Sequence, residues 1–127
     1  MKALVAFLMI GNSALFLFGA MQHAGITLGR FHEPVIAPAA IVEAICGLSL
    51  LWGVAGLLRH SRTRWQAALI ANFVALGGVL LGIAALAAGA GPRTASNDFY
   101  HRIMLLLIGA SVLILFSGRS RLNQTLR

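Results

Sequence analysis

The sequence contains few charged residues, and very few of these are acidic. Lysine, arginine, aspartate and glutamate make up 10% of the 127 residues, and only three residues are aspartate or glutamate. Hydrophobic residues make up 59%, and the mean hydropathy is +0.88. This balance excludes an ordinary soluble domain and a disordered chain. It indicates an integral membrane protein.

Cysteine and catalytic motifs are also scarce. Cys46 is the single cysteine, so the chain cannot form an internal disulfide, and its apolar neighbours favour a small buried side chain. The sequence shows no nucleophile with an adjacent base, no paired-carboxylate motif and no phosphate-binding glycine loop. Ordinary hydrolytic or phosphoryl-transfer chemistry is therefore not expected, and we expect no catalytic activity from the chain on its own.

Four apolar runs account for almost the whole chain. Each is close to the ~20 residues that a helix needs to cross ~30 Å of hydrocarbon. Gly91 and Pro92 mark the end of the third run, and residues 96–98 offer N-cap side chains for the fourth. The sequence predicts an all-α fold, a single transmembrane domain folded as a four-helix bundle, with helices at about 3–21, 37–58, 65–90 and 99–118.

The basic residues are distributed unevenly between the two sides that four crossings would create. One side receives seven of the ten basic residues, namely Lys2, Arg59, Arg62, Arg64, Arg119, Arg121 and Arg127. The other side receives Arg30, Arg93 and Arg102. This positive-inside pattern predicts a multi-pass inner-membrane protein with both termini in the cytoplasm. The composition and brevity of the chain favour a bacterial source. The net charge of +7 is then explained by membrane anchoring and contact with lipids, not by nucleic-acid binding.

The third apolar run carries small residues at alternating gaps of three and four. The series contains Ala68, Ala71, Ala75, Gly78, Gly82, Ala85 and Gly89. A stripe of this kind allows two helix backbones to approach closely, so we expect helix packing along it, centred on Ala71, Ala75, Gly78, Gly82 and Ala85. The packing partner is either another helix of the chain or a second copy.

Glu43 is the only charged residue in the second apolar run. An ionisable group inside a membrane helix costs roughly 2.5–3.5 kcal/mol on insertion scales, so it marks a functional site by default. Six residues after Ala37, it should lie roughly 9 Å into the membrane. Two interpretations remain open: a carboxyl group that only fixes helix packing, held by Arg102, Arg30 or a histidine or protonated by burial, and a ligand or proton site.

All three acidic residues and three of the four histidines map to the outer ends of the predicted helices. Asp98, His101 and Arg102 share one face of the fourth helix by their spacing, so that Asp98 could orient the imidazole or pair with the guanidinium. The sequence predicts a polar ligand or proton site there, formed by Glu43, His101, Arg102, His23 and Asp98. A metal site built from His23, His32 and His101 is the alternative, although no close ligand spacing supports it.

The second helix and its exit resemble the DoxX-type family of small four-helix membrane proteins. The resemblance rests on Glu43-x-x-x-Gly47-Leu48-x-Leu50-Leu51-x-Gly53, followed by a basic turn and an alanine-rich third helix. It implies a role linked to quinone reduction, sulfur-compound oxidation or thiol and oxidative-stress complexes. Of the family's residues, it carries over Glu43 alone.

Three functional hypotheses follow from these observations. The first is a redox-linked or quinone-associated membrane subunit with a polar pocket centred on Glu43, for which the cofactor would be a quinone in preference to a metal. The second is a structural or assembly subunit, acting as a homo-oligomer or within a larger membrane complex. The third is a small transporter or metal-handling protein that uses the histidines.

Overall fold

A computed structural model describes residues 2–27, 33–59 and 64–124, with side chains up to Gly118. Within these ranges the chain is all-helical, with α1 (Lys2–His23), α2 (Ala37–Leu58), α3 (Arg64–Ala87) and α4 (Ala95–Gln124). Each of the four helices is long and apolar enough to cross a membrane. The predicted all-α class and the four spanning-length helices are confirmed.

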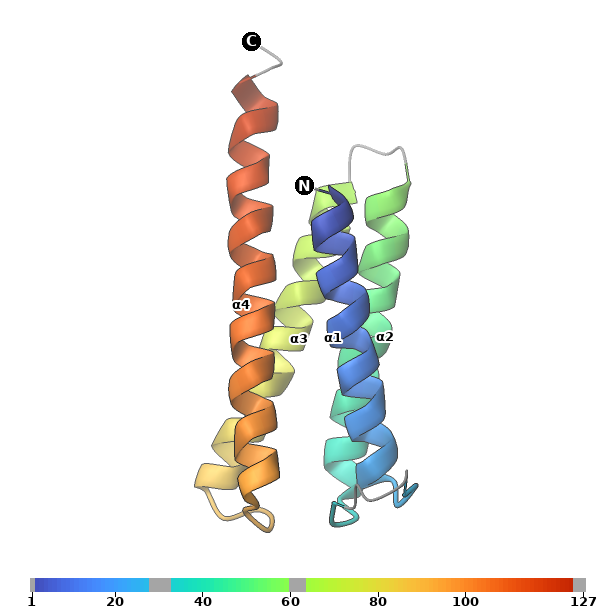
Figure 1. Cartoon of the computed structure of the whole chain (residues 1–127), viewed down its shortest axis with the longest axis vertical. Helices are drawn as coiled ribbons and strands as arrows, with labels where there is room; N and C mark the ends of the chain where they lie inside the picture. Colours follow the sequence, from blue (N-terminus) through green and yellow to red (C-terminus); the bar gives the residue numbers. More distant parts are fainter. Residues whose placement is uncertain (1, 28–32, 60–63, 125–127) are drawn as a thin grey trace.

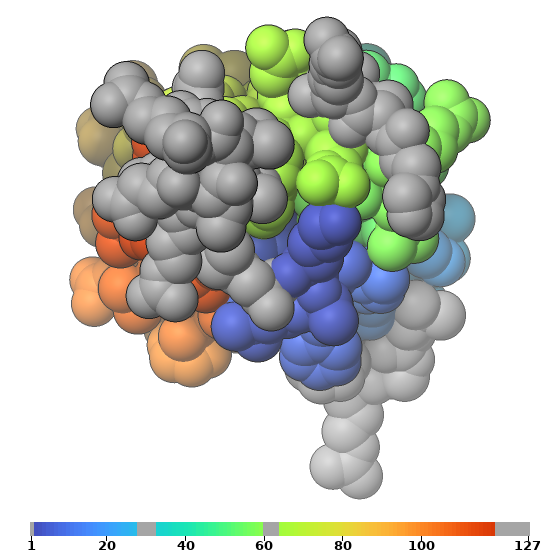
Figure 2. Space-filling view, turned by 90° about the horizontal axis from the view of Figure 1, so that it is seen from above, coloured from blue at the N-terminus to red at the C-terminus, as the bar shows by residue number. Residues whose placement is uncertain are grey.

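The four helices run alternately up and down and form a closed ring. Figure 1 shows the start of α1, the end of α2, the start of α3 and the end of α4 at one end of the bundle. The other end, where α1 and α3 finish and α2 and α4 begin, is called the pocket end below. Each helix packs against its neighbours in sequence, and α4 also packs against α1. Figure 2 shows this order from above, with α1 between α4 and α2.

Small residues set the separation between neighbouring helices. A Cβ atom on Gly53 of α2 would lie 2.6 Å from the Cβ of Ala71 on α3 and 2.6 Å from the Cε of Met9 on α1. Any side chain at this position would therefore push α2 and α3 apart and displace the end of the Met9 side chain. Van der Waals contact through such residues is the main source of association between helices in lipid, where burial of apolar surface offers little.

The small-residue stripe of α3 packs against helices of the same chain. Ala71 and Ala75 are fully buried. A Cβ on Gly78 would collide with the thiol of Cys46 on α2, and one on Gly82 would collide with the imidazole of His101 on α4. The stripe was predicted to pack either on another helix of the chain or on a second copy. At these glycines, the structure shows packing on neighbouring helices of the same chain.

Two helices end in glycines with positive φ. Gly25 follows α1 with a φ of 86°, and Gly89 follows α3 with a φ of 74°. Around Gly89, the backbone N–H of Ala90 bonds the carbonyl of Ala85, and that of Gly89 bonds the carbonyl of Leu86. This is the hydrogen-bond pattern of a Schellman motif, which terminates a helix.

These terminal motifs correct the predicted helix ends. The α3 helix stops at Ala87, before the predicted end at residue 90, because Gly89 breaks it ahead of Gly91 and Pro92. The α1 helix continues to His23, beyond the predicted end at residue 21. The α2 helix begins at Ala37, as predicted.

The start of α4 also differs from the prediction. The helix begins at Ala95 and not at residue 99. The hydroxyl of Thr94 accepts the backbone N–H of Asn97 at 3.0 Å, so Thr94 performs the N-cap role assigned to residues 96–98. Asp98 lies in the first turn, where its charge complements the helix dipole.

Replacement of Gly89 by alanine should destabilise the bundle. A Cβ there meets no atom within 4 Å, so the cost comes from the positive φ alone, about 1–2 kcal/mol for a residue with a Cβ. The control is Gly77→Ala, a substitution within α3 that also meets no atom within 4 Å and should stabilise the bundle by about 0.5–1 kcal/mol. The free energy of unfolding in mixed micelles measures both effects. Equal stability of the two variants would contradict the Schellman assignment.

Candidate functional site

Glu43 lies in the second turn of α2, at the pocket end, with only 7% of its surface exposed. Its carboxylate rests against the backbone of Gly19 on α1. A Cβ on Gly19 would lie 2.8 Å from Oε1 and 2.9 Å from Oε2. The absence of a side chain at residue 19 therefore makes the room that the carboxylate occupies.

One oxygen of the Glu43 carboxylate has no hydrogen-bond partner among the described residues. Its Oε2 atom is buried and makes no hydrogen bond there. Arg102, one of the predicted partners, is exposed and lines a different, smaller pocket. Arg30, another predicted partner, lies outside the described residues. A buried polar group without a partner costs free energy, so this carboxylate is a site where a ligand or proton would be stabilising.

Tyr100 of α4 brings a hydroxyl to the same place. The hydroxyl lies close to the Glu43 carboxylate, but the geometry is outside that of a normal hydrogen bond. Like Oε2, the hydroxyl is buried and has no hydrogen-bond partner among the described residues. Two complementary polar groups from α2 and α4 therefore meet without satisfying each other.

Two histidines line the same pocket, and each is fixed through one ring nitrogen. Nδ1 of His101 lies 2.9 Å from the carbonyl oxygen of Asn97, and Nδ1 of His23 lies 3.1 Å from that of Pro34. A carbonyl oxygen only accepts hydrogen bonds, so each Nδ1 carries the proton. In a neutral ring, Nε2 is then a hydrogen-bond acceptor.

These groups surround a mainly apolar cavity of about 330 Å³ between the helices. The size falls in the lower range of ligand pockets, about 300–1,000 Å³. The polar members are Glu43, His23, Asn97, Tyr100 and His101. Aliphatic and small residues form the remaining wall, among them Ile36, Val42, Val79, Leu81, Gly82 and Ala85. The pocket can hold an apolar body and hydrogen-bond its polar groups.

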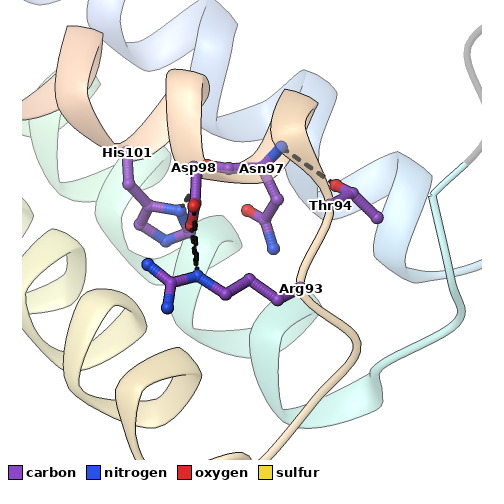
Figure 3. Close-up of polar contacts among 5 residues, drawn as sticks. All are labelled: Arg93, Thr94, Asn97, Asp98 and His101. Atoms are coloured by element: carbon purple, nitrogen blue, oxygen red, sulfur yellow. Dashed lines mark hydrogen bonds and ion pairs between the residues drawn. The ribbon is translucent and has the colours of Figure 1, made fainter.

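Two other predicted site residues lie beside this pocket and do not line it. Asp98 pairs with Arg93 at 3.0 Å, and not with Arg102 or His101 as predicted. Figure 3 shows this pair next to the imidazole of His101. Arg93, Asp98 and Arg102 line a second cavity of about 200 Å³, and His101 lies between the two cavities. Of the predicted ligand site, Glu43, His23 and His101 share the main pocket.

The α1–α2 connection is attached to both sides of the pocket end. The backbone N–H of Ile36 bonds the carbonyl of His23 at 3.0 Å, and the Thr94 hydroxyl donates to a Glu33 carboxylate oxygen at 3.2 Å. A Cβ on Gly91 would lie 3.3 Å from Ile36. These contacts tie the entry to α2 to α1 and to the start of α4.

The predicted metal site lacks support in the described part of the chain. His32 lies outside it, and no three His, Cys, Asp or Glu residues within it come close enough to hold a metal ion. His23 and His101 contribute instead to the main pocket. Nε2 of His101 packs against Gly82, whereas Nε2 of His23 remains a potential acceptor for an organic ligand.

Tyr100 and Asn97 are pocket residues that the sequence did not predict as such. Tyr100 reads as a marker of the membrane interface and Asn97 as a helix cap. Both lie within about one helical turn of His101 on α4, so His101 was the residue by which the sequence marked this part of the pocket.

Comparison with family models, curated proteins and solved structures found no match to the chain.

Gly82→Ala should disturb the pocket and the bundle together. The added Cβ collides with the imidazole of His101, which Asn97 holds on its other side. Overpacking of this kind costs about 1–3 kcal/mol. Gly109→Ala on α4 is the matched control, because a Cβ there meets nothing within 4 Å. Unfolding in mixed micelles checks the difference, and equal stability would mean that the α3–α4 contact does not limit packing.

Proposed function

We propose that this protein is a multi-pass protein of a bacterial inner membrane that binds a quinone-type ligand in the pocket around Glu43. It acts there as a redox-linked subunit and depends on a partner protein for the redox reaction. The observation that carries the proposal is the buried Oε2 atom of Glu43, which makes no hydrogen bond to the described residues and lies, with the Tyr100 hydroxyl, at the wall of a cavity of about 330 Å³.

The exposed surface of the helices supports the membrane setting. Phe7 is 73% exposed, and Leu106 and Leu113 are each 69% exposed. In water, exposed apolar surface on this scale promotes aggregation, whereas lipid tails solvate it. The basic residues Lys2, Arg59 and Arg64 gather at the end opposite the pocket (Figure 1), which supports a cytoplasmic location for that end.

The lining of the pocket supports a quinone-type ligand. Such a ring is flat and apolar, and it carries two oxygen substituents that form hydrogen bonds. The polar groups of Glu43, Tyr100 and His101 come from two helices, and apart from His23 and Asn97 the rest of the wall is apolar. The ring would occupy the apolar space, and its oxygens would satisfy polar atoms that the fold leaves unpaired.

The resemblance to DoxX-type proteins adds a redox context. The motif that begins at Glu43 carries that resemblance. Under this proposal, the partner supplies electrons or removes them, and the chain contributes the binding site within the membrane. Glu43, which the motif and the pocket share, is the residue on which both arguments depend.

The proposed topology predicts thiol accessibility. Thr27→Cys and Arg59→Cys each place one cysteine on an exposed position in a Cys46→Ala background, at opposite ends of the bundle. In intact cells, a membrane-impermeant thiol reagent should label residue 27, and residue 59 should react only after permeabilisation. Labelling of residue 59 alone from outside would reverse the topology.

Ligand binding tests the proposed site. The chain purified in mild detergent should bind a short-chain, ubiquinone-type ligand supplied as a mixture of oxidised and reduced forms, and Glu43→Ala should weaken binding by roughly 10-fold or more. That factor corresponds to one hydrogen bond to a charged group, about 1.5–3 kcal/mol. Equilibrium dialysis measures the dissociation constant.

The control for this experiment is Glu33→Ala. Glu33 is an acidic residue at the same end of the bundle that bonds Thr94 and does not line the pocket. This variant should bind the ligand as the parent does. Equal weakening in both variants would point to a general effect of charge, and no binding by the parent would end the quinone proposal.

A further inference from the structure

The second cavity, of about 200 Å³, differs from the main pocket in its charge. Its apolar wall comes from the end of α3, namely Ile83, Leu86 and Ala87. Its charged members are Arg93, Asp98 and Arg102, whereas no lysine or arginine of the described chain lines the main pocket. Both arginines are exposed, so the second cavity is accessible from the molecular surface.

The two guanidinium groups keep donors that no described residue uses. Arg93 bonds the Asp98 carboxylate through Nε, and Figure 3 shows its two terminal nitrogens directed away from that carboxylate. Arg102 makes no ion pair or hydrogen bond within the described part of the chain. Asp98 offsets one of the two positive charges, so a net charge of +1 remains. Planar guanidinium groups fit the oxygens of a phosphate, so the second cavity suits an anion of that kind.

Arg102 also lies at the head of an exposed apolar face of α4. Phe99 precedes it by three residues, and Leu106 and Leu113 follow it by four and eleven, so all four side chains share one face. The three apolar residues are exposed. From Arg102 to Leu113 the helix rises roughly 16 Å, which is close to half of the ~30 Å hydrocarbon thickness. A lipid chain along this face would therefore run from the second cavity to the middle of the bilayer.

A less specific explanation is that each arginine only reaches toward the headgroup layer, as basic residues near the ends of membrane helices do. The convergence of the two arginines favours a defined site. Arg93 comes from the α3–α4 connection and Arg102 from the second turn of α4, yet both line one cavity. Its volume is many times the roughly 10–15 Å³ that one water molecule needs. Basic pockets between membrane helices bind anionic lipid headgroups in this way.

We infer that the second cavity binds the phosphate of an anionic phospholipid, held by Arg93 and Arg102, with an acyl chain along Leu106 and Leu113. The inference rests on the membrane setting proposed above and is independent of a quinone-type ligand in the main pocket. The net charge of +1 favours a headgroup with a net negative charge, such as phosphatidylglycerol. In phosphatidylcholine, the ammonium group cancels the charge of the phosphate.

Native mass spectrometry of the full chain in mild detergent tests the site by measuring the dissociation constant of the first bound lipid. The probes are phosphatidylglycerol and phosphatidylcholine with the same acyl chains. Phosphatidylglycerol should bind about fivefold more tightly, the effect of one cation near an anionic headgroup. An excess of ammonium phosphate should not displace it, because inorganic phosphate lacks the chains that pack along α4.

Arg102→Gln removes one charge and keeps a long polar side chain. Because Arg102 is exposed and has no partner in the described part of the chain, the bundle should fold as before. The preference for phosphatidylglycerol over phosphatidylcholine should fall to within about twofold. Arg59→Gln is the matched control, since Arg59 is an exposed arginine at the opposite end that does not line the second cavity. This variant should keep the parent preference.

Three outcomes would overturn the inference. Equal affinity of the parent for the two lipids would remove the anionic selectivity. An equal loss of preference in Arg59→Gln and Arg102→Gln would show that total charge, and not the second cavity, attracts the lipid. Displacement of phosphatidylglycerol by inorganic phosphate would identify a site for soluble anions. Each of these results leaves the proposed function intact, because ligand binding in the main pocket is measured separately.

Discussion

The burial of the Glu43 carboxylate between apolar helices is the constraint on which the pocket end of the molecule depends. The carboxylate needs space, and the missing side chain of Gly19 provides it. The hydroxyl of Tyr100 on α4 is a polar group that lies close to it. No cation pairs with it in the described part of the chain, and its buried Oε2 atom makes no hydrogen bond there.

Close helix contacts hold that arrangement in place. Glycines on α3 admit the Cys46 thiol from α2 and the His101 imidazole from α4. A larger residue at either position would separate the helices that supply the polar groups. The same stripe that stabilises the bundle therefore sets the width of the pocket, so that packing and binding cannot be varied independently here.

The sequence predicted the helices well because apolar runs of spanning length have few other structural solutions. It located Glu43 as a site for a similar reason, since a lone charge in such a run is costly. Helix ends were harder to predict, because Gly89 and Gly91 both offer a stop signal and the earlier one operates.

The composition of the pocket could not be read from the sequence. His101 and Arg102 are consecutive, yet consecutive residues on a helix point about 100° apart, and only His101 lines the main pocket. Which of the two faces α2 depends on the rotation of α4 about its axis. Helices that are apolar on all sides carry no local signal for that rotation, so Tyr100 and Asn97 were also missed.

The position of the His101 ring has a consequence for the entropy of binding. Gly82 confines one nitrogen edge of the ring, and the Asn97 carbonyl holds the other. Immobilising a side chain on association costs about 0.5–1.5 kcal/mol. Here the ring is ordered when the chain folds, so a ligand that packs against the imidazole in the pocket loses little free energy to ordering this side chain.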